Sequence, residues 1–267
     1  MKLLNRLLVA AAGALALAAP GLAAEEAKKP EAHTWSWEGP FGQYDQAELQ
    51  RGFQVYQQVC ASCHALEYMS FRNLGEEGGP FYDPDYPNPN DNPVVRAIAA
   101  DYMITDGPDE FGEMFEREGR PADRFPNPFP NDNAAAAANG GAVPPNLSLI
   151  VKARTGGAEY IRSLMLGYDY PVPEDVTVRP GQYYNPYFPG GVLAMPPQLM
   201  EGLVEYADGT EATPEQMAHD VTAFLAWASE PHMEARKSLG FMVMIYLLIV
   251  CVLVWLAYRQ VWSRVHH

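Results

Sequence analysis

The residues Cys60-Ala61-Ser62-Cys63-His64 form a motif in which two cysteines are separated by two residues and followed at once by a histidine. This spacing places two thiols about one helical turn apart, so both can reach the vinyl groups of one haem while the next imidazole faces the iron. The motif therefore predicts one covalently attached haem c, with Cys60 and Cys63 as attachment points and His64 as an iron ligand.

Two other kinds of site use a cysteine pair at this spacing. A thioredoxin-like redox pair needs a surrounding strand-turn-helix of α/β character, which the sequence lacks. A zinc site needs two further ligands at matching spacing, and the one remaining cysteine, Cys251, lies in an apolar stretch where a small apolar role is expected. Three cysteines also cannot form the dense disulfide framework of a small secreted scaffold.

The second axial ligand of the iron decides between an electron carrier and a reactive site. A methionine sulfur raises the iron potential and closes the site, whereas an open position permits oxygen or peroxide chemistry. Met195 is the leading candidate, because it lies in Gly190-Gly191-Val192-Leu193-Ala194-Met195-Pro196-Pro197, where glycines permit close backbone approach and prolines stiffen the loop. The alternatives, most of them expected to fill the core, are Met69, Met103, Met114, Met165, Met200, Met217 and Met233.

Haem propionates need donors or cations, and a basic cluster supplies three candidates. For Lys152 and Arg162 we expect ordinary surface ion pairing. Arg154 is followed by Gly156-Gly157, which lets its neighbourhood close against a ligand. Among the remaining histidines, His219 falls on the polar side of its predicted helix, where a solvated side chain is expected.

Helical periodicity is strong in four stretches, whereas strand signals are scarce. One runs over 45–59, with Asp45 as cap and Glu48 as its partner, and leads into Cys60. The others cover 147–154, 161–167 and 213–228, and three Pro-rich or Gly-rich stretches between them (81–93, 121–145 and 171–197) are expected to be long loops. The sequence thus predicts a mainly α c-type cytochrome domain whose long irregular loops wrap a ligand.

Two apolar segments frame this domain. Residues 1–24 carry Lys2 and Arg6, a short apolar run and small residues, which is typical of a secretory signal peptide. The segment 239–258 has no charged residue and is long enough to cross a bilayer as a helix. We therefore expect an exported domain over 25–235 and an anchor with a short cytoplasmic tail over 236–267.

The charge of the chain narrows the class of partner. Lys and Arg total 18 against 33 Asp and Glu, which disfavours a nucleic-acid partner. All of the acidic residues lie in the predicted exported domain. Two interpretations remain open, solubility alone or steering of a basic partner.

The pattern as a whole resembles the cytochrome c1 family, the haem subunits of cytochrome bc1 complexes, in a bacterial form. The stretches that carry the resemblance span nearly the whole mature protein: 59–64, Pro144-Pro145-Asn146-Leu147-Ser148, Ala153-Arg154-Thr155-Gly156-Gly157, Asn185-Pro186-Tyr187-Phe188-Pro189-Gly190, Ala194-Met195-Pro196-Pro197 and Ala228-Ser229-Glu230-Pro231.

The resemblance implies roles and partners that the residues alone do not give. Met195 would be the sixth iron ligand, and Arg154, together with Tyr160, would hold a haem propionate. The chain would accept one electron from a Rieske iron-sulfur protein and pass it to a soluble c-type cytochrome during quinol oxidation. Cytochrome b would lie beside the transmembrane helix of a dimeric multi-subunit complex, with the haem domain in the periplasm and the anchor in the bacterial inner membrane.

Some bacterial relatives carry an extra cysteine pair in the domain, and no such pair exists here. Packing and the prolines are therefore expected to hold the Met195 loop. Two rival functions stay open: another membrane-anchored cytochrome, and a haem enzyme or gas sensor with an open coordination position.

Overall fold

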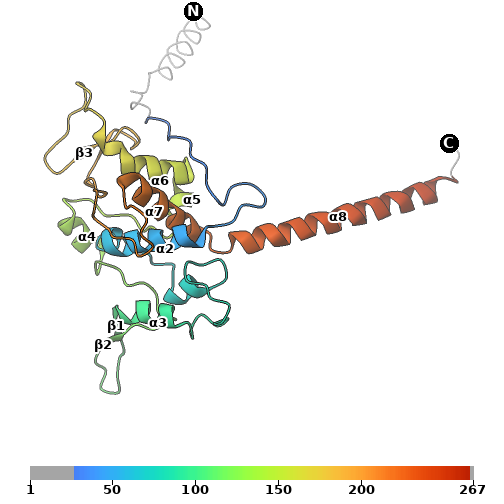
Figure 1. Ribbon diagram of the computed structural model, residues 1–267, viewed down its shortest axis with the longest axis horizontal. Coiled ribbons are helices and arrows are strands. Elements are labelled where there is room, and N and C mark those ends of the chain that lie inside the picture. The colour runs from blue at the N-terminus through green and yellow to red at the C-terminus, as the bar shows by residue number, and fades with distance from the viewer. Residues whose placement is uncertain (1–26, 265–267) are drawn as a thin grey trace, which may run out of the picture.

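A computed structural model describes residues 27–264 of the chain, and the predicted signal peptide lies outside these residues. Within them helices dominate and the strands form two short antiparallel hairpins, which confirms the predicted mainly α fold (Figure 1). The elements are α2 (Gln46–Val55), a π-helical turn η1 (Tyr56–Cys60), a 3-10 turn η2 (Phe71–Gly75), α3 (Pro93–Ala100), β1 (Met103–Asp106), β2 (Phe115–Glu118), α4 (Asp132–Ala138), α5 (Ile150–Ala153), α6 (Gly157–Leu166), a 3-10 turn η3 (Gly167–Asp169), β3 (Tyr183–Tyr184), β4 (Val192–Leu193), α7 (Pro214–Ser229) and α8 (Met233–Trp262).

The core is centred on the packing of α2 against α7. A Cβ atom at Gly52 would lie 2.0 Å from the backbone oxygen of Asp220, so only glycine permits this close approach. Phe53 and Phe224 meet edge to face with ring centroids 5.6 Å apart. Beside them, Arg51 donates two hydrogen bonds, of 3.0 and 3.1 Å, to the fully buried carboxylate of Asp220.

The helix caps form as the sequence predicts, with one difference in each capping box. The side chains of Asp45 and Thr213 accept hydrogen bonds from the backbone of Glu48 and Gln216. The side chains of Glu48 and Gln216, however, bind elsewhere, Glu48 at His219 and Gln216 at Asp220. In each capping box, therefore, only the hydrogen bond accepted by the N-cap side chain follows from the local sequence.

The helices α3 and α4 and both hairpins were not predicted. Helix α3 is capped by Asn92, whose side chain accepts from two backbone amides, and α4 is capped by Asn131 inside the stretch expected to be loop. The β1–β2 hairpin is largely exposed, so its sequence lacks the apolar alternation that marks a half-buried strand. It is stabilised by Arg117, which pairs with Asp106 and Asp123.

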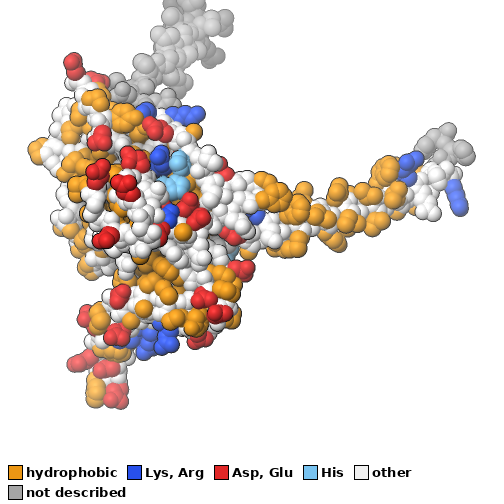
Figure 2. All heavy atoms as spheres, viewed as in Figure 1, with side chains coloured by type: hydrophobic (Ala, Val, Ile, Leu, Met, Phe, Trp, Pro, Cys, Tyr) orange, Lys and Arg blue, Asp and Glu red, His pale blue; other side chains and the backbone are white. Residues whose placement is uncertain are grey.

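Helix α8 extends away from the rest of the chain, and its apolar side chains are exposed along its length (Figure 2). Among the described residues it is the one helix long and apolar enough to cross a membrane. The predicted span 239–258 lies entirely within its 30 residues. A membrane anchor near the C-terminus is therefore supported.

Candidate haem-binding site

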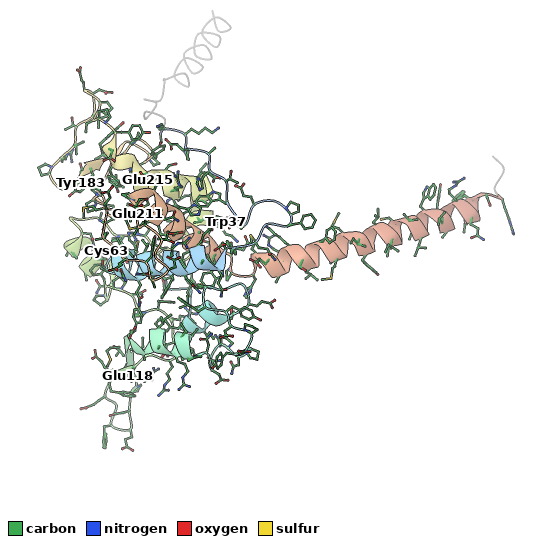
Figure 3. All side chains as sticks on the ribbon, viewed as in Figure 1. Trp37, Cys63, Glu118, Tyr183, Glu211 and Glu215 are labelled. Atoms are coloured by element: carbon green, nitrogen blue, oxygen red, sulfur yellow. The ribbon has the colours of Figure 1, made fainter. Side chains whose placement is uncertain are left out.

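The Cys60 to His64 motif forms a single turn at the end of the α2 region. Helix α2 changes to the π-helical turn η1, which ends at Cys60. The backbone amides of Cys63 and His64 then donate to the carbonyl of Cys60, at 3.1 and 2.9 Å. This turn brings both thiols and the imidazole onto one short piece of backbone, and Figure 3 labels Cys63 there.

The two thiols of this turn are half-buried and not joined in a disulfide. Burial raises the pKa of Cys60 to about 12, and the neighbouring charge of Cys63 acts in the same direction. Reactive redox cysteines and zinc ligands have lowered thiol pKa values instead. The buried surroundings of Cys60 are therefore unlike those of a reactive redox cysteine.

His64 is oriented by the backbone carbonyl of Pro145, which lies 2.8 Å from Nδ1. A carbonyl oxygen only accepts, so Nδ1 carries the proton and the lone pair of Nε2 remains for a metal. Burial lowers the pKa of His64, and the hydrogen bond to Pro145 opposes this in part. The neutral imidazole that an iron ligand requires is thus the favoured form.

The Pro145 loop is itself held against the chain that follows the motif. The amide of Leu147 donates to the carbonyl of Ala65 at 2.9 Å. Fully buried Ser148 accepts through its hydroxyl from the amide of Tyr68 at 3.0 Å. Residues 144–148 carry part of the family resemblance, but no role for Pro145 follows from the sequence, since a backbone acceptor leaves no signature in its side chain.

Met195 lies just after β4, half-buried, and its carbonyl accepts a hydrogen bond of 3.0 Å from the hydroxyl of Tyr168. The same loop is fixed by Asn185, which is fully buried and donates to the carbonyl of Leu164 at 2.7 Å. A Cβ at Gly167 would lie 2.6 Å from the side-chain amide oxygen of Asn185, so only glycine lets Asn185 pack this closely against the end of α6. Hydrogen bonds to the end of α6 therefore hold the loop in addition to packing and prolines. Met195 as an iron ligand stays a prediction.

Of the two propionate candidates, Arg154 directly follows α5 and Tyr160 lies in the first turn of α6. Arg154 is exposed, and Tyr160 is buried with 7% of its surface exposed. Burial raises the pKa of the Tyr160 hydroxyl, and the positive charge of Arg154 lowers it. Lys152 forms the surface ion pair expected of it, with Glu230 at 3.1 Å. The Nε atom of Arg162, by contrast, is buried and has no hydrogen-bond partner among residues 27–264.

His219 differs from its prediction. Its Nδ1 lies 2.9 Å from Nε2 of His33, its Nε2 lies 3.2 Å from Glu48, and its ring stacks on Trp35. The expected solvated side chain was wrong, because the N-terminal segment covers this side of α7. That contact joins residues 186 positions apart, and the periodicity of one helix cannot reveal it.

The donor set fits a haem. Two unpaired thiols, an imidazole with Nε2 free and half-buried apolar side chains at Val59 and Ala61 lie in one stretch of chain. Some of this apolar surface packs directly on the core. A separate cavity of about 430 Å³, lined by Arg96, Arg117 and Arg120 among others, contains none of the predicted site residues.

Comparison with known proteins agrees with this geometry. The profile described as the cytochrome C1 family matches residues 35–265. The chain is 42% identical over 280 residues to "Cytochrome c1" of Rhodospirillum rubrum, covering 99% of each chain. It is 47% identical over 225 residues to "Cytochrome c1, heme protein, mitochondrial" of Saccharomyces cerevisiae, covering 84% of this chain and 69% of that one.

A further relative is longer than this chain. "Cytochrome b/c1" of Bradyrhizobium diazoefficiens is 48% identical over 276 residues, which is 96% of this chain and 39% of that relative. The chain thus spans well under half of that relative's length. The family match covers most of the chain and two of these relatives align over more than nine-tenths of it, so the chain belongs to the cytochrome c1 family.

Proposed function

We propose that this chain is the membrane-anchored, haem-carrying electron-transfer subunit of a cytochrome bc1 complex. One haem c would be bound through Cys60 and Cys63, with His64 and Met195 as the axial ligands. The observation that carries this proposal is the hydrogen bond from His64 Nδ1 to the Pro145 carbonyl, which leaves Nε2 free one residue after an unpaired thiol.

When bound, the haem supplies a centre that takes up and releases one electron. The residues of the chain then have distinct tasks. Pro145 fixes the tautomer and ring direction of His64, and Tyr168 holds the backbone of Met195 in place. Arg154, with Tyr160, would bind a haem propionate, because the guanidinium is exposed and close enough to influence the Tyr160 hydroxyl.

The proposed partners are two redox proteins. The chain would accept an electron from a Rieske iron-sulfur protein and pass it to a soluble c-type cytochrome during quinol oxidation. Cytochrome b would pack beside α8 in a dimeric multi-subunit complex. The chain itself would make and break no substrate bonds. Acidic side chains are numerous on the face seen in Figure 2, which suits a basic soluble partner.

The topology that follows has one membrane crossing. Residues 1–24 would be removed as a signal peptide, residues 25–235 would form the periplasmic haem domain, and 236–267 would supply the anchor and a cytoplasmic tail. Basic residues flank both ends of the span, so their distribution does not decide the orientation. Export of the N-terminus by the signal peptide would set it instead.

The axial assignment is tested by Met195→Leu in the purified complex. The variant is expected to lose the sulfur-to-iron charge-transfer band, to show a lower potential and to bind carbon monoxide when reduced. Met200→Leu makes the same replacement at an exposed methionine five residues on and should change none of these. An unchanged spectrum and potential in Met195→Leu would exclude Met195, and carbon monoxide binding to the unaltered protein would favour the haem enzyme or sensor.

The assignment to a bc1 complex has its own test. Purification in mild detergent should yield a b-type cytochrome and a Rieske protein together with this chain. A chain that purifies alone, or with an oxidase, would place it with another membrane-anchored cytochrome.

A further inference from the structure

A tight turn over residues 37–42 lies beside the start of α8 (Figure 1). Two glycines shape it: Gly39 has a φ of +72°, and a Cβ at Gly42 would lie 2.0 Å from the carbonyl oxygen of Glu38. Neither position tolerates a side chain without a change of backbone. The turn presents Phe41 outward, with 74% of its surface exposed.

Polar bonds fix this turn to the first turns of α8. The ammonium group of Lys237 donates to the carbonyl oxygens of Trp37 and Gly42, at 2.6 and 3.1 Å. One helical turn earlier, Glu234 accepts from the amide of Tyr44 at 2.8 Å. The turn and the beginning of α8 therefore behave as one unit, and Figure 3 labels Trp37 near their junction.

An aromatic contact shows where the turn lies along the length of α8. The rings of Phe41 and Phe241 meet edge to face with centroids 5.6 Å apart. Phe241 is itself 53% exposed and belongs to the uncharged run that begins at Leu239. Phe41 thus lies level with the first residues of the membrane span, where aromatic side chains favour the boundary between lipid and water.

We propose that residues 37–42 form a membrane-contacting turn, with Phe41 inserted in the interfacial layer of the bilayer beside α8. The occupant of this surface is lipid, because the exposed face of Phe41 is continuous with the exposed apolar face of α8. The ties at Lys237 and Glu234 then set the angle between the haem domain and the membrane. The inference rests on membrane anchoring by α8, which is part of the proposed function.

The test measures the surroundings of a nitroxide label at position 41 in the full complex, reconstituted into phospholipid vesicles. Collisions with oxygen, which dissolves in lipid, are compared with collisions with a water-soluble nickel chelate. Phe41→Cys is labelled in a Cys251→Ser background, and native Cys251 in the unaltered chain serves as the reference within the span. Phe111→Cys, at a side chain 81% exposed in the β1–β2 connection, is the matched control for an aromatic far from α8.

The oxygen-to-nickel ratio at position 41 should be several-fold higher than at 111 and lower than at 251. A ratio equal to that at 111 would overturn the proposal, because Phe41 would face water. Low collision rates with both reagents would also overturn it, since a protein subunit would then cover the turn. If Phe41→Cys does not mature, Pro40→Cys reports on the same turn.

The same experiment distinguishes failure of the proposed function from failure of the inference about Phe41. A label at Cys251 that behaves as at 111 would refute the membrane span itself. Labelling of Cys60 or Cys63 in the unaltered chain would refute haem attachment. Neither result depends on the position of Phe41.

Discussion

The hydroxyl of Tyr168, just beyond α6, donates a hydrogen bond of 3.0 Å to the backbone carbonyl of Met195, 27 residues further along the chain. This bond connects the helical core to the loop that carries the proposed sulfur ligand. A phenol in this position holds the backbone of the proposed ligand through its carbonyl. Tyr168 is therefore a positioning residue for Met195.

Replacing Tyr168 with Phe is expected to weaken the Met195 loop by about 1 kcal/mol, the usual net value of one such bond. The sulfur-to-iron charge-transfer band should disappear at a lower temperature than in the unaltered protein, while the haem stays attached. Tyr86→Phe alters an exposed tyrosine in a distant loop and should leave the melting of the band unchanged. Equal melting of the band in both variants would show that the bond does not position the ligand.

Removing Arg51 is expected to destabilise the α2–α7 pair strongly. Arg51→Ala would leave the Asp220 carboxylate, whose side chain is 0% exposed, without its cationic partner. Loss of one partner of a buried pair lowers the free energy of unfolding by about 3 to 5 kcal/mol. Denaturant titration in detergent, followed by circular dichroism, measures this change.

The control for that measurement is Arg236→Ala, which breaks an ion pair whose arginine is 62% exposed. Such surface pairs contribute at most about 1 kcal/mol. Similar losses in the two variants would contradict the importance of the Arg51–Asp220 pair.

The attachment of the N-terminal segment should depend on pH through His33. Burial, with smaller effects of Arg162 and His219, lowers the pKa of His33 below its ordinary value of 6.5. The folded state therefore favours neutral His33, so its contribution to stability is present above pH 6.5 and is lost as the pH falls below it. The protection of residues 27–37 against hydrogen exchange, corrected for the intrinsic pH dependence of exchange, should fall accordingly.

The matched variants for this pH effect are His33→Gln and His232→Gln. His33→Gln should flatten the pH dependence of exchange in the segment. His232 is exposed at the end of the domain, and its replacement should leave the dependence intact. A pH dependence that survives in His33→Gln would assign it to another group.

Electron transfer to a basic soluble cytochrome should become slower as salt rises. All 33 acidic residues lie before residue 235, and screening weakens long-range attraction between opposite charges. Stopped-flow oxidation of the reduced complex at increasing ionic strength measures the association rate. A rate independent of salt would mean that the acidic surface serves solubility alone.

The sequence predicted the parts of this protein that depend on local chemistry. The caps at Asp45 and Thr213 and the apolar run of α8 follow from neighbouring residues, and the structure has the expected elements in each place. The return hydrogen bond from the third residue of each capping box does not form. The side chain of Glu48 binds His219 instead, and that of Gln216 binds Asp220.

Contacts distant in sequence were beyond prediction from one chain. The bond between His64 and the Pro145 carbonyl uses a backbone atom 81 residues away, and no side chain marks it. His219 was misassigned because the segment that carries His33 packs on its helix from outside. The exposed β1–β2 hairpin depends on the ion pairs of Arg117, not on an apolar face.

The most direct test of the central claim is extraction of the mature protein with acidified organic solvent after denaturation. The red pigment should stay with the polypeptide, and Cys60→Ala or Cys63→Ala should impair its attachment. Pigment that leaves the unaltered chain under these conditions, or a fully matured chain without colour, would show that no haem is covalently attached.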